Sequence, residues 1–504
     1  MKRIFTFLLA LMMALVLAVP AFAADETYTI TITNTAAGHT YEAYQIFAGD
    51  LHGKVLSNIV WGSGVSAAGQ AALGDAADKA ASLTSSDAAH AFAKEVADYL
   101  TSPAVSAAGN GGYTISGLKA GYYLVKDKDN TLTDADDFYT AYIMEVVGDV
   151  TALPKGDKPT LDKQIKHNEN GEWGVVGDNQ IGDTVAFRII TKVPHTTGYT
   201  NYDYIIHDTM SAGLTSNVKG AADITIKVDD ENVLPGEYYS VTANGNTFSV
   251  TVDILQAIAD KKMAPDNKLF TYYTGVLNAD ALIYDEGKQD NVAYLEYSNN
   301  PNDNDGKGET PKKTVYDWTF KMVVNKLDGN DKPLTGAKFV LSKESTLQVT
   351  CNDQGIPTVT TDLIGMVKVS DGVYRIAVTG DANVVHVIDA GSAVIKGLDD
   401  ATDYYLYETK APAGYNLLKE PVKFRISAKY SEDGSALAAN YPTVTVNNGD
   451  PSTTLSADIV NNSGSTLPST GGIGTTIFYV VGSVLVIGAA VVLITRKRMG
   501  KSDK

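Results

Sequence analysis

Residues 318–326 read Trp-Thr-Phe-Lys-Met-Val-Val-Asn-Lys, and every second residue from 318 to 324 is apolar. Alternate residues of a β-strand share one face, so the pattern predicts a strand whose apolar face is buried in a core. Lys326 is the next residue in phase, and the same periodicity directs its side chain into that core. This strand, with a lysine on its buried face, indicates the fold and the chemistry of the rest of the chain.

Two more strands near the C-terminal end of the chain each direct a polar residue inward by the same test. Asn461 follows an alternating apolar run that begins at Leu455, and Glu408 follows a run that begins at Tyr404. This part of the chain therefore offers one lysine, one carboxylic acid and one asparagine to its own core.

An earlier part of the chain repeats this set with different residues. Lys163 is in phase with the apolar residues two positions before and after it, Asp208 ends an alternating run over 202–206, and Asn291 begins one that continues to residue 297. The alternative is that these polar groups lie at strand ends in solvent. Agreement of all six assignments favours two complete inward triads.

Such a triad has a definite chemistry. Burial lowers the pKa of a lysine and raises that of a carboxylic acid until their neutral forms become accessible, and a neutral amine is a nucleophile. A protonated carboxyl can donate a hydrogen bond to the asparagine amide oxygen and stabilise the oxyanion formed when the lysine attacks, after which ammonia leaves. Fixed contact supplies an effective molarity of ~10⁵ M or more. The sequence thus predicts one isopeptide bond in each of the two domains that contain a triad, tying the first strand of that domain to its last.

Bulk properties are those of an exported protein. The chain has 504 residues and a formal net charge of -18, and the negative charge argues against nucleic acid as a partner. It has one cysteine, so an internal disulfide is excluded. Lys2 and Arg3 precede an apolar run over 4–19, and small residues follow, so residues 1–23 read as a secretory signal peptide with the mature chain starting near Ala24.

The other end of the chain resembles a cell-wall sorting signal. An uncharged apolar run over 473–494 precedes Arg496, Lys497 and Arg498, which predicts a membrane-spanning helix with a cytoplasmic basic end. The segment before it resembles the LPXTG motif of Gram-positive surface proteins and consists of Leu467, Pro468, Ser469, Thr470 and Gly471. The resemblance implies that a sortase cuts after the threonine, making Thr470 an acyl donor. A single-pass protein with a chance match is the alternative.

Alternating patches recur along the whole chain and predict an all-β protein of three tandem sandwiches. One helix is predicted in the first domain, with Ser85, Ser86 and Asp87 as N-cap candidates and with Phe92, Val96 and Leu100 at helical spacing. The residues Ile-Ser-Gly-Leu at 115–118 recur as Ile-Lys-Gly-Leu at 395–398, which indicates that the first and last domains are related. The predicted divisions are 1–23 (signal peptide), 24–153, 154–316, 317–463 and 464–504 (sorting segment and anchor).

Several motifs resemble those of the SpaA/FimA-type major pilins of Gram-positive bacteria. Residues 407–415 (Tyr-Glu-Thr-Lys-Ala-Pro-Ala-Gly-Tyr) are similar to their E-box, and residues 326–328 with 334–339 resemble the opening of a CnaB-type domain. Residues 162–163, 207–209 and 291 with 299–301 are similar to the second domain of these pilins. The match covers nearly the whole mature chain.

This resemblance implies immunoglobulin-like sandwiches of CnaB and CnaA type and assigns the bonds and their acids. The implied pairs are Lys326–Asn461 with Glu408 and Lys163–Asn291 with Asp208. In the first domain Lys126 stands at the E-box position and no inward lysine opens the first strand, so no isopeptide bond is expected there.

An acyl donor requires an amine, which polymerising pilins supply from a lysine between their first two domains. Residues 147–155 occupy the matching place and retain Val150, Pro154 and Lys155 of the family pattern, but they lack its tryptophan and have Leu153 in place of its tyrosine. Lys155 is the predicted acceptor, and Lys158 is the competing amine. The alternative is that Lys155 is an ordinary solvated lysine in a linker.

Three functions remain open from the sequence. The first is a cell-wall-anchored backbone pilin, whose partners are sortase, copies of itself, accessory pilins and peptidoglycan, with a host surface ligand as a further candidate. The second is a singly anchored adhesin or accessory pilin in which Lys155 is unused. The third is a surface enzyme, but the sequence contains no metalloprotease or nucleophile-elbow motif. Neither a cofactor nor a metal is expected. The polar loop over 299–306 is predicted to be a solvated turn, because Lys312 replaces the glutamate of a calcium loop.

Overall fold

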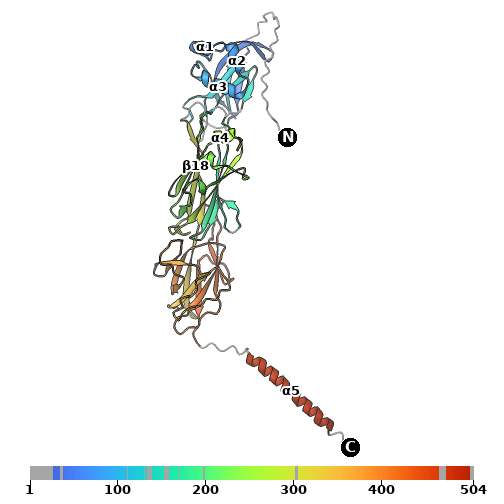
Figure 1. The fold of residues 1–504 in the computed structure, drawn as a ribbon, viewed down its shortest axis with the longest axis vertical. Coiled ribbons are helices and arrows are strands. Elements are labelled where there is room, and N and C mark those ends of the chain that lie inside the picture. Colours follow the sequence, from blue (N-terminus) through green and yellow to red (C-terminus); the bar gives the residue numbers. More distant parts are fainter. Residues whose placement is uncertain are drawn as a thin grey trace.

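The computed structural model describes residues 26–34, 38–109, 112–129, 131–132, 139–152, 158–168, 170–196, 199–300, 305–464 and 473–499. The described strands form six sheets, which pack in pairs as three sandwiches arranged end to end in chain order (Figure 1). This confirms the all-β fold of tandem sandwiches predicted from the alternating pattern. The signal peptide, Lys155 and the segment from Leu467 to Gly471 lie outside the described residues.

The N-terminal sandwich pairs a sheet of order β5-β6-β1-β9 with one of order β3-β2-β7-β8, and β4 is added to β2. Its strands are β1 (Tyr28–Ile32), β2 (Tyr41–His52), β3 (Val55–Trp61), β4 (Ala104–Val105), β5 (Ala107–Gly109), β6 (Gly112–Leu118), β7 (Gly121–Asp127), β8 (Ala141–Val146) and β9 (Val150–Ala152). Strand β1 pairs antiparallel with β6 and parallel with β9, so the first strand lies in the middle of its sheet.

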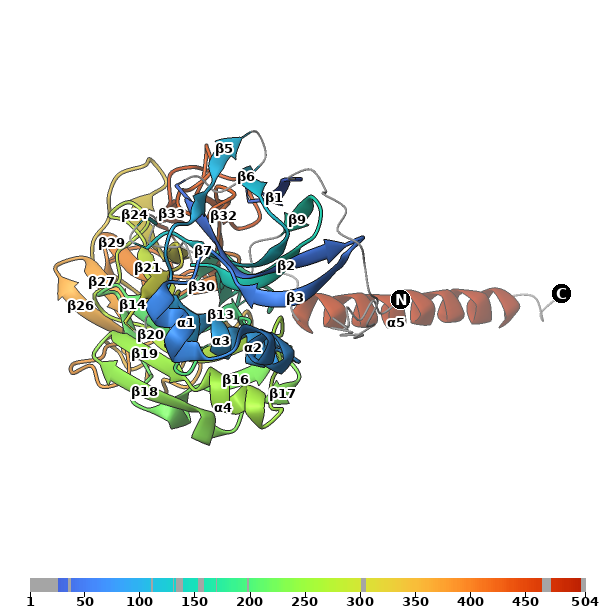
Figure 2. The ribbon, with the colours of Figure 1, turned by 90° about the horizontal axis from the view of Figure 1, so that it is seen from above.

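Helices cover the outer face of the β2-containing sheet (Figure 2). Helix α3 (Ser86–Ala97) confirms the predicted helix: the Ser85 side chain accepts a hydrogen bond from the Ala88 N–H, and Phe92 packs on Phe47. Two helices that the sequence analysis did not predict precede it, α1 (Ala67–Leu73) and α2 (Ala76–Ser82). They are too short and alanine-rich to produce a clear 3.6-residue apolar period.

The middle sandwich pairs a sheet of order β11-β10-β13-β20-β16-β17 with one of order β12-β23-β21-β14-β19-β18. Strand β15 is added to β20 and β22 to β21. Its strands are β10 (Leu161–Lys166), β11 (Trp173–Gly174), β12 (Val176–Asp178), β13 (Thr184–Lys192), β14 (Tyr204–Met210), β15 (Leu214–Ser216), β16 (Thr225–Val228), β17 (Asn232–Val233), β18 (Tyr239–Asn244), β19 (Thr247–Val252), β20 (Lys268–Leu277), β21 (Gln289–Ser298), β22 (Lys307–Glu309) and β23 (Lys313–Trp318). The short helices η1 (Ala221–Asp223), η2 (Gly236–Tyr238) and α4 (Ile254–Ala259) connect strands at its edge.

The C-terminal sandwich pairs a sheet of order β26-β27-β29-β24-β33 with one of order β28-β25-β30-β31-β32. Its strands are β24 (Phe320–Asp328), β25 (Ala337–Ser342), β26 (Met366–Ser370), β27 (Val373–Ile376), β28 (Ile388–Ala390), β29 (Ser392–Leu398), β30 (Asp403–Lys410), β31 (Val422–Ser427), β32 (Thr443–Val446) and β33 (Ser456–Asn461). The boundary predicted between residues 316 and 317 falls inside β23, because that strand pairs with β12 and β21 of the middle sandwich up to Trp318. Only Thr319 separates it from β24.

The alternation that predicted the strands also describes their burial. Along β24 the residues in phase with Phe320 are buried and those between them are partly exposed, and β33 and β21 show the same period of two. One continuous cluster of buried apolar side chains runs through the middle and C-terminal sandwiches, whereas the N-terminal sandwich has separate clusters. The last two sandwiches therefore share a packed junction.

Helix α5 (Ile473–Met499) follows the sandwiches. Its segment Tyr479–Lys497 is 19 residues long with a mean hydropathy of 2.1, and none of it is buried against the rest of the chain. This helix is long and apolar enough to cross a bilayer, as the sequence predicted for the C-terminal anchor.

Candidate isopeptide-forming sites

Two lysines, Lys163 and Lys326, are buried among the residues that the structure describes, with exposed fractions of 1% and 0%. They are the two lysines whose side chains the alternating sequence pattern predicted to point into a core. The acids and asparagines assigned to them are buried as well: Asp208, Asn291, Glu408 and Asn461. All six polar residues therefore lie in sandwich cores, and the alternative that they end in solvent does not hold.

In the C-terminal sandwich Lys326 and Asn461 lie on neighbouring strands of one sheet. Strands β24 and β33 run parallel, with Lys326 opposite Ile459 and Asp328 opposite Asn461. The two side chains are therefore diagonal neighbours on the buried face of the sheet, and the Lys326 ammonium donates to the Ile459 carbonyl at 2.7 Å. These strands are the first and last of the sandwich, as predicted.

Glu408 reaches this pair from β30 in the facing sheet. The Asn461 amide nitrogen donates to its Oε1 at 3.0 Å and its Oε2 at 2.9 Å, and also to the Asn416 carbonyl at 2.8 Å. The Leu418 N–H donates to Glu408 Oε2 at 2.8 Å, which fixes the carboxyl group from the backbone. The acid is thus held against the amide that is expected to react.

Burial shifts both ionisable groups toward their neutral forms. Desolvation lowers the pKa of Lys326 below its ordinary value, with the nearby Glu408 carboxylate opposing the shift. Desolvation raises the pKa of Glu408, against the hydrogen bonds from Asn461 and Leu418. Burial therefore favours the neutral amine and the neutral carboxylic acid over the charged forms in this core.

The asparagine amides have a common orientation in both candidate sites. The amide nitrogen of Asn461 faces Glu408, and the amide oxygens of Asn461 and Asn291 have no hydrogen-bond partner. The expected donation from acid to amide oxygen requires a half-turn of the amide group. In the orientation observed, the carboxyl group faces the nitrogen that would depart as ammonia, where it can supply a proton.

In the middle sandwich the triad spans the two sheets. Lys163 lies on β10, whereas Asp208 and Asn291 lie on the paired strands β14 and β21 of the facing sheet, where Asp208 is opposite Ala293 and Met210 is opposite Asn291. Strands β22 and β23 follow β21 in the chain, so the expectation that the bond ties the first strand to the last is wrong for this sandwich. A Lys163–Asn291 bond would join sheet to sheet.

Tyr273 completes this second site from β20. Its hydroxyl donates to Asp208 and accepts from the Lys163 ammonium and, at 3.2 Å, from the Asn291 amide nitrogen. Lys163 also donates directly to the Asp208 carboxylate. One phenol therefore contacts the nucleophile, the acid and the amide that are expected to react.

The surroundings of this site are apolar and aromatic. The Phe187 ring stacks on Tyr273, and the Lys163 ammonium lies 5.7 Å from the Phe187 ring centre. Desolvation lowers the pKa of Lys163 and raises the pKa of Asp208, and the Coulombic attraction between the two opposes each shift. Burial also raises the pKa of Tyr273 well above its ordinary value, so the phenol remains protonated.

The sequence analysis missed Tyr273, although the alternation of inward and outward residues along its strand could have identified it. Along β20 the buried positions are 269, 271, 273, 275 and 277, which places the Tyr273 hydroxyl on the inward face. Tyrosine is common on buried strand faces, and the test was applied only to lysine, carboxylic acids and asparagine. Which inward tyrosine meets the triad is decided by the packing of one sheet on the other.

Replacing Tyr273 by phenylalanine keeps the ring and removes the bridging hydroxyl. If that hydroxyl relays a proton between Lys163, Asp208 and the leaving amide, bond formation in the middle sandwich should slow by roughly 10²-fold. A time course of intact mass after rapid purification measures it as delayed loss of one ammonia. The Tyr272→Phe variant is the matched control, because Tyr272 faces the other way and donates to Asp230 at 2.6 Å. Equal rates in the two variants would exclude this role.

The N-terminal sandwich has a different polar arrangement. Lys126 is partly exposed and pairs with Asp129 at 2.7 Å, whereas its neighbour Asp127 is buried and lies 2.8 Å from the ring nitrogen Nδ1 of His39. No lysine is buried in the described part of this sandwich. The lack of an isopeptide bond here stays a prediction. The buried acid at the end of β7 is Asp127, one residue after Lys126, which stands at the E-box position.

Lys158 lies just before β10 and is half-buried. Lys155 and the residues Leu467, Pro468, Ser469, Thr470 and Gly471 lie outside the described part of the chain. The assignment of Thr470 as the acyl donor and Lys155 as the acceptor of a sorting reaction therefore depends on the sequence alone.

Two family models match the chain. Residues 320–437 match the SpaA prealbumin-like fold domain, and residues 459–499 match the LPXTG cell wall anchor motif. The first covers most of the C-terminal sandwich, including Lys326 and Glu408. The second covers Asn461, the sorting motif and helix α5. These matches support the cell-wall anchorage that the C-terminal sequence indicated.

Curated relatives are surface proteins of Gram-positive bacteria. The trypsin-resistant surface T6 protein of Streptococcus pyogenes is 27% identical over 69% of this chain and 70% of its own length. Fimbrial subunit type 1 of Actinomyces viscosus is 25% identical over 77% of this chain and 74% of its own. The solved T6 backbone pilin of S. pyogenes has a TM-score of 0.51 at 18% identity, covering 88% of this chain and all of the other, and so has a similar fold. Taken with the anchor and the SpaA-type domain, these similarities support an LPXTG-anchored major pilin of Gram-positive bacteria.

Proposed function

We propose that this pilus protein is the backbone subunit of a covalent fibre. Sortase breaks the Thr470–Gly471 peptide bond and transfers the threonine carbonyl to the Lys155 amine of another copy, forming one amide bond for the one broken. The anchor at the C-terminal end, the similarity to surface and fimbrial proteins and the end-to-end row of sandwiches support this assignment (Figure 1). Accessory pilins and peptidoglycan would accept the same acyl group.

We further propose that the sandwiches are locked by Lys163–Asn291 and Lys326–Asn461 isopeptide bonds. The observation that supports this best is that the two buried lysines of the described chain each share a core with a buried acid and an asparagine. In each case the lysine nitrogen attacks the asparagine Cγ, a carbon–nitrogen amide bond forms, and the original bond to the side-chain nitrogen breaks. The acid accepts a proton from the amine and returns one to the departing ammonia.

Proton transfer inside such a pair changes no net charge. A buried ammonium–carboxylate pair and a buried amine–carboxylic acid pair differ only in the position of one proton, and desolvation favours the neutral pair. The lowered pKa of each lysine and the raised pKa of Asp208 and Glu408 act in this direction. The nucleophile therefore becomes available without removing a proton to solvent.

The two bonds would also define how the fibre carries tension. Force applied between Thr470 and Lys155 would pass along 461–470 to the Asn461–Lys326 bond, along 291–326 to the Asn291–Lys163 bond, and then to residue 155. The strands between residues 163 and 291, and between 326 and 461, would lie outside this covalent path. Pulling on the fibre would then leave most of the last two sandwiches unloaded.

The mass of the ectodomain tests the internal chemistry directly. Each bond releases one ammonia, so the purified ectodomain should be lighter than its formula by two ammonia molecules, and peptide mapping should place the crosslinks at Lys163–Asn291 and Lys326–Asn461. A mass equal to the unmodified formula would refute both bonds. A third loss would place a bond in the N-terminal sandwich, against the prediction for it.

A singly anchored adhesin or accessory pilin is the second candidate. It would retain the same sandwiches and the same internal bonds, but Lys155 would have no partner. The two candidates differ in whether the surface protein forms multimers that resist boiling in detergent.

A further inference from the structure

The junction between the middle and C-terminal sandwiches is closely packed and polar. Ile181 donates its N–H to the Gly397 carbonyl at 3.0 Å, and the Tyr404 hydroxyl donates to the Gln180 side chain at 3.1 Å. Gly397 has a φ of +90°, and a Cβ at that position would lie 2.6 Å from the Ile181 side chain, so only glycine permits this approach. Next to this contact lies a group of four aspartates.

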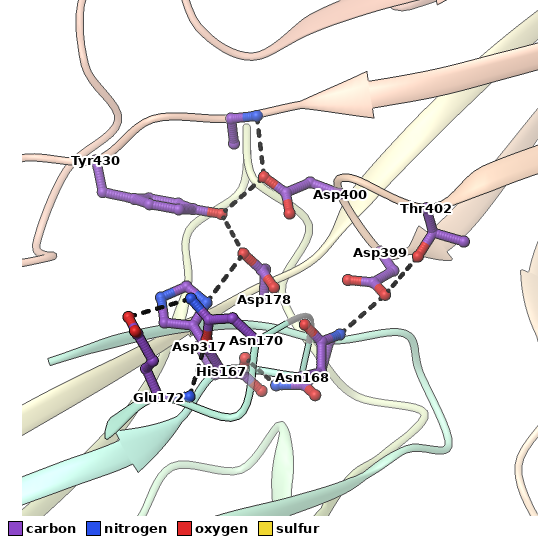
Figure 3. Close-up of polar contacts among 12 residues, drawn as sticks. His167, Asn168, Asn170, Glu172, Asp178, Asp317, Asp399, Asp400, Thr402 and Tyr430 are labelled. Carbon is purple, nitrogen blue, oxygen red and sulfur yellow. Dashed lines mark hydrogen bonds and ion pairs between the residues drawn. The ribbon is translucent and has the colours of Figure 1, made fainter. Parts of the chain in front are cut away.

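The four aspartates come from three separate segments and are buried (Figure 3). Asp178 ends β12 and Asp317 lies on the neighbouring strand β23, whereas Asp399 and Asp400 follow β29 of the C-terminal sandwich. Their exposed fractions are 2%, 1%, 4% and 4%, respectively. We refer to these four residues as the junction acids.

Each junction acid keeps one oxygen without a hydrogen-bond partner: Asp178 Oδ1, Asp317 Oδ2, Asp399 Oδ1 and Asp400 Oδ1. Their other oxygens are occupied. Asn168 and Thr402 donate to Asp399 at 2.9 and 3.0 Å, Ala428 N–H donates to Asp400 at 2.9 Å, Asn179 donates to Asp317 at 2.8 Å, and the Tyr430 hydroxyl contacts Asp178 and Asp400 (Figure 3). The acids are thus fixed in place by donors that leave four buried oxygens unsatisfied, which is costly.

Neighbouring cationic side chains do not neutralise this group. Within the described residues no lysine or arginine forms an ion pair with a junction acid, and His167 is 3.9 Å from Asp178. Arg425 pairs with Asp403 at 3.4 Å, and the Lys429 ammonium lies over the Tyr441 ring. Lys343 acts on Asp399 only through longer-range attraction.

We propose that three of the junction acids, Asp178, Asp399 and Asp400, bind a divalent cation of the calcium class. One carboxylate oxygen from each of Asp178, Asp399 and Asp400 lies within 4.8 Å of the others. Calcium takes oxygen ligands at about 2.3–2.6 Å, so two ligands on opposite sides of the ion are up to roughly 5 Å apart. An open cavity of about 510 Å³, lined by His167, Asp178, Asp400 and Tyr430 among others, gives the ion access from solvent.

The site joins two sandwiches through one ion. Asp178 and Asp317 belong to the middle sandwich, and Asp399 and Asp400 belong to the C-terminal one, so occupancy would fix the angle between them. This inference goes beyond the proposed polymerisation, because it concerns the stiffness of the subunit and needs neither sortase nor the isopeptide bonds.

Calcium titration of the ectodomain tests the proposal, and helix α5 can be omitted because none of it is buried against the sandwiches. With CaCl2 as the titrant, calorimetry should give one ion per chain with a Kd on the order of 10⁻⁴ M or tighter, as in extracellular calcium modules. The melting temperature should rise by roughly 5 °C in 5 mM CaCl2 and by less in MgCl2.

Isosteric variants locate the ion. Asp178→Asn and Asp400→Asn should each weaken calcium binding at least tenfold and remove the calcium-dependent rise in melting temperature, while remaining folded because each removes a charge from the core. Asp305→Asn, in the polar loop at 299–306, is the control and should bind as the wild type does. The proposal would be overturned if the wild type bound no calcium, or if the two junction variants bound calcium as tightly as the wild type. Loss of binding in Asp305→Asn alone would place the ion in that loop and overturn it as well.

Discussion

Replacing Lys155 by alanine should convert the cell-wall form of this pilin from a ladder of covalent multimers into a single species. Thr470 can form an amide only where an amine is presented, and the sequence predicts that Pro154 holds the preceding backbone extended and presents Lys155 on a turn. Cell-wall extracts boiled in detergent and probed with antibody against the ectodomain would measure the loss, which should be complete. The remaining monomer should stay attached to peptidoglycan, because its sorting motif is unchanged.

Lys158→Ala is the matched control for this experiment. Lys158 is the competing amine nearest to Lys155 in the sequence, and it lies just before β10. The ladder should persist in this variant. A ladder lost in Lys158→Ala but kept in Lys155→Ala would move the acceptor to Lys158. A wild type that runs as a single species would instead support the singly anchored adhesin.

Replacing Glu408 by glutamine should prevent the bond in the C-terminal sandwich and make that sandwich much less stable. Glutamine keeps the size of the side chain and an oxygen acceptor for the Leu418 N–H, but it cannot exchange a proton with Lys326 or with the departing amide nitrogen. The ectodomain should then lose one ammonia instead of two. Lys326→Ala and Asn461→Ala should give the same mass deficit, since each removes one partner of the same bond.

The stability loss follows from the length of chain that the bond closes. Residues 326 and 461 are 135 positions apart, and by analogy with a disulfide closing a loop of that length the crosslink contributes about 5 kcal/mol. At about 2–4 °C per kcal/mol for a domain of this size, the melting temperature of the C-terminal sandwich should fall by roughly 10–20 °C. Scanning calorimetry should resolve this as a separate, lower transition.

Glu420→Gln is the control for Glu408→Gln. Glu420 is an exposed glutamate in the same sandwich, so its loss of charge should change neither the two ammonia losses nor the melting temperature by more than a degree or two. A Glu408→Gln protein that still loses two ammonia molecules would show that the acid is dispensable. One that loses a single ammonia but melts as the wild type would show that the bond adds no thermal stability.

Strand periodicity determined a large part of this protein. The direction in which Lys326, Asn461 and Glu408 point was readable from the apolar residues in phase with them, and burial confirms it for both triads. The C-terminal anchor was equally readable, because length, apolarity and flanking charge are properties of a contiguous segment. Helices α1 and α2 were missed because seven residues are too few to establish a helical period.

What periodicity could not supply is the partner of each inward side chain. It reports a direction relative to one strand, whereas contacts depend on which strands are neighbours and which sheets face each other. Packing alone therefore decided that Lys326 and Asn461 share a sheet while Lys163 and Asn291 face each other across a sandwich. It also brought Tyr273 into the second triad.

The junction acids show the same limit most clearly. Asp178, Asp317 and Asp399 are far apart in the sequence, and no local pattern connects them. They meet because the ends of β12, β23 and β29 converge where two sandwiches abut. The sequence by itself determined which residues enter a core and which end of the chain enters the membrane, since both depend on hydrophobic order along the backbone. Only the tertiary structure decided which buried groups touch, because contact distance is set by how separate strands pack.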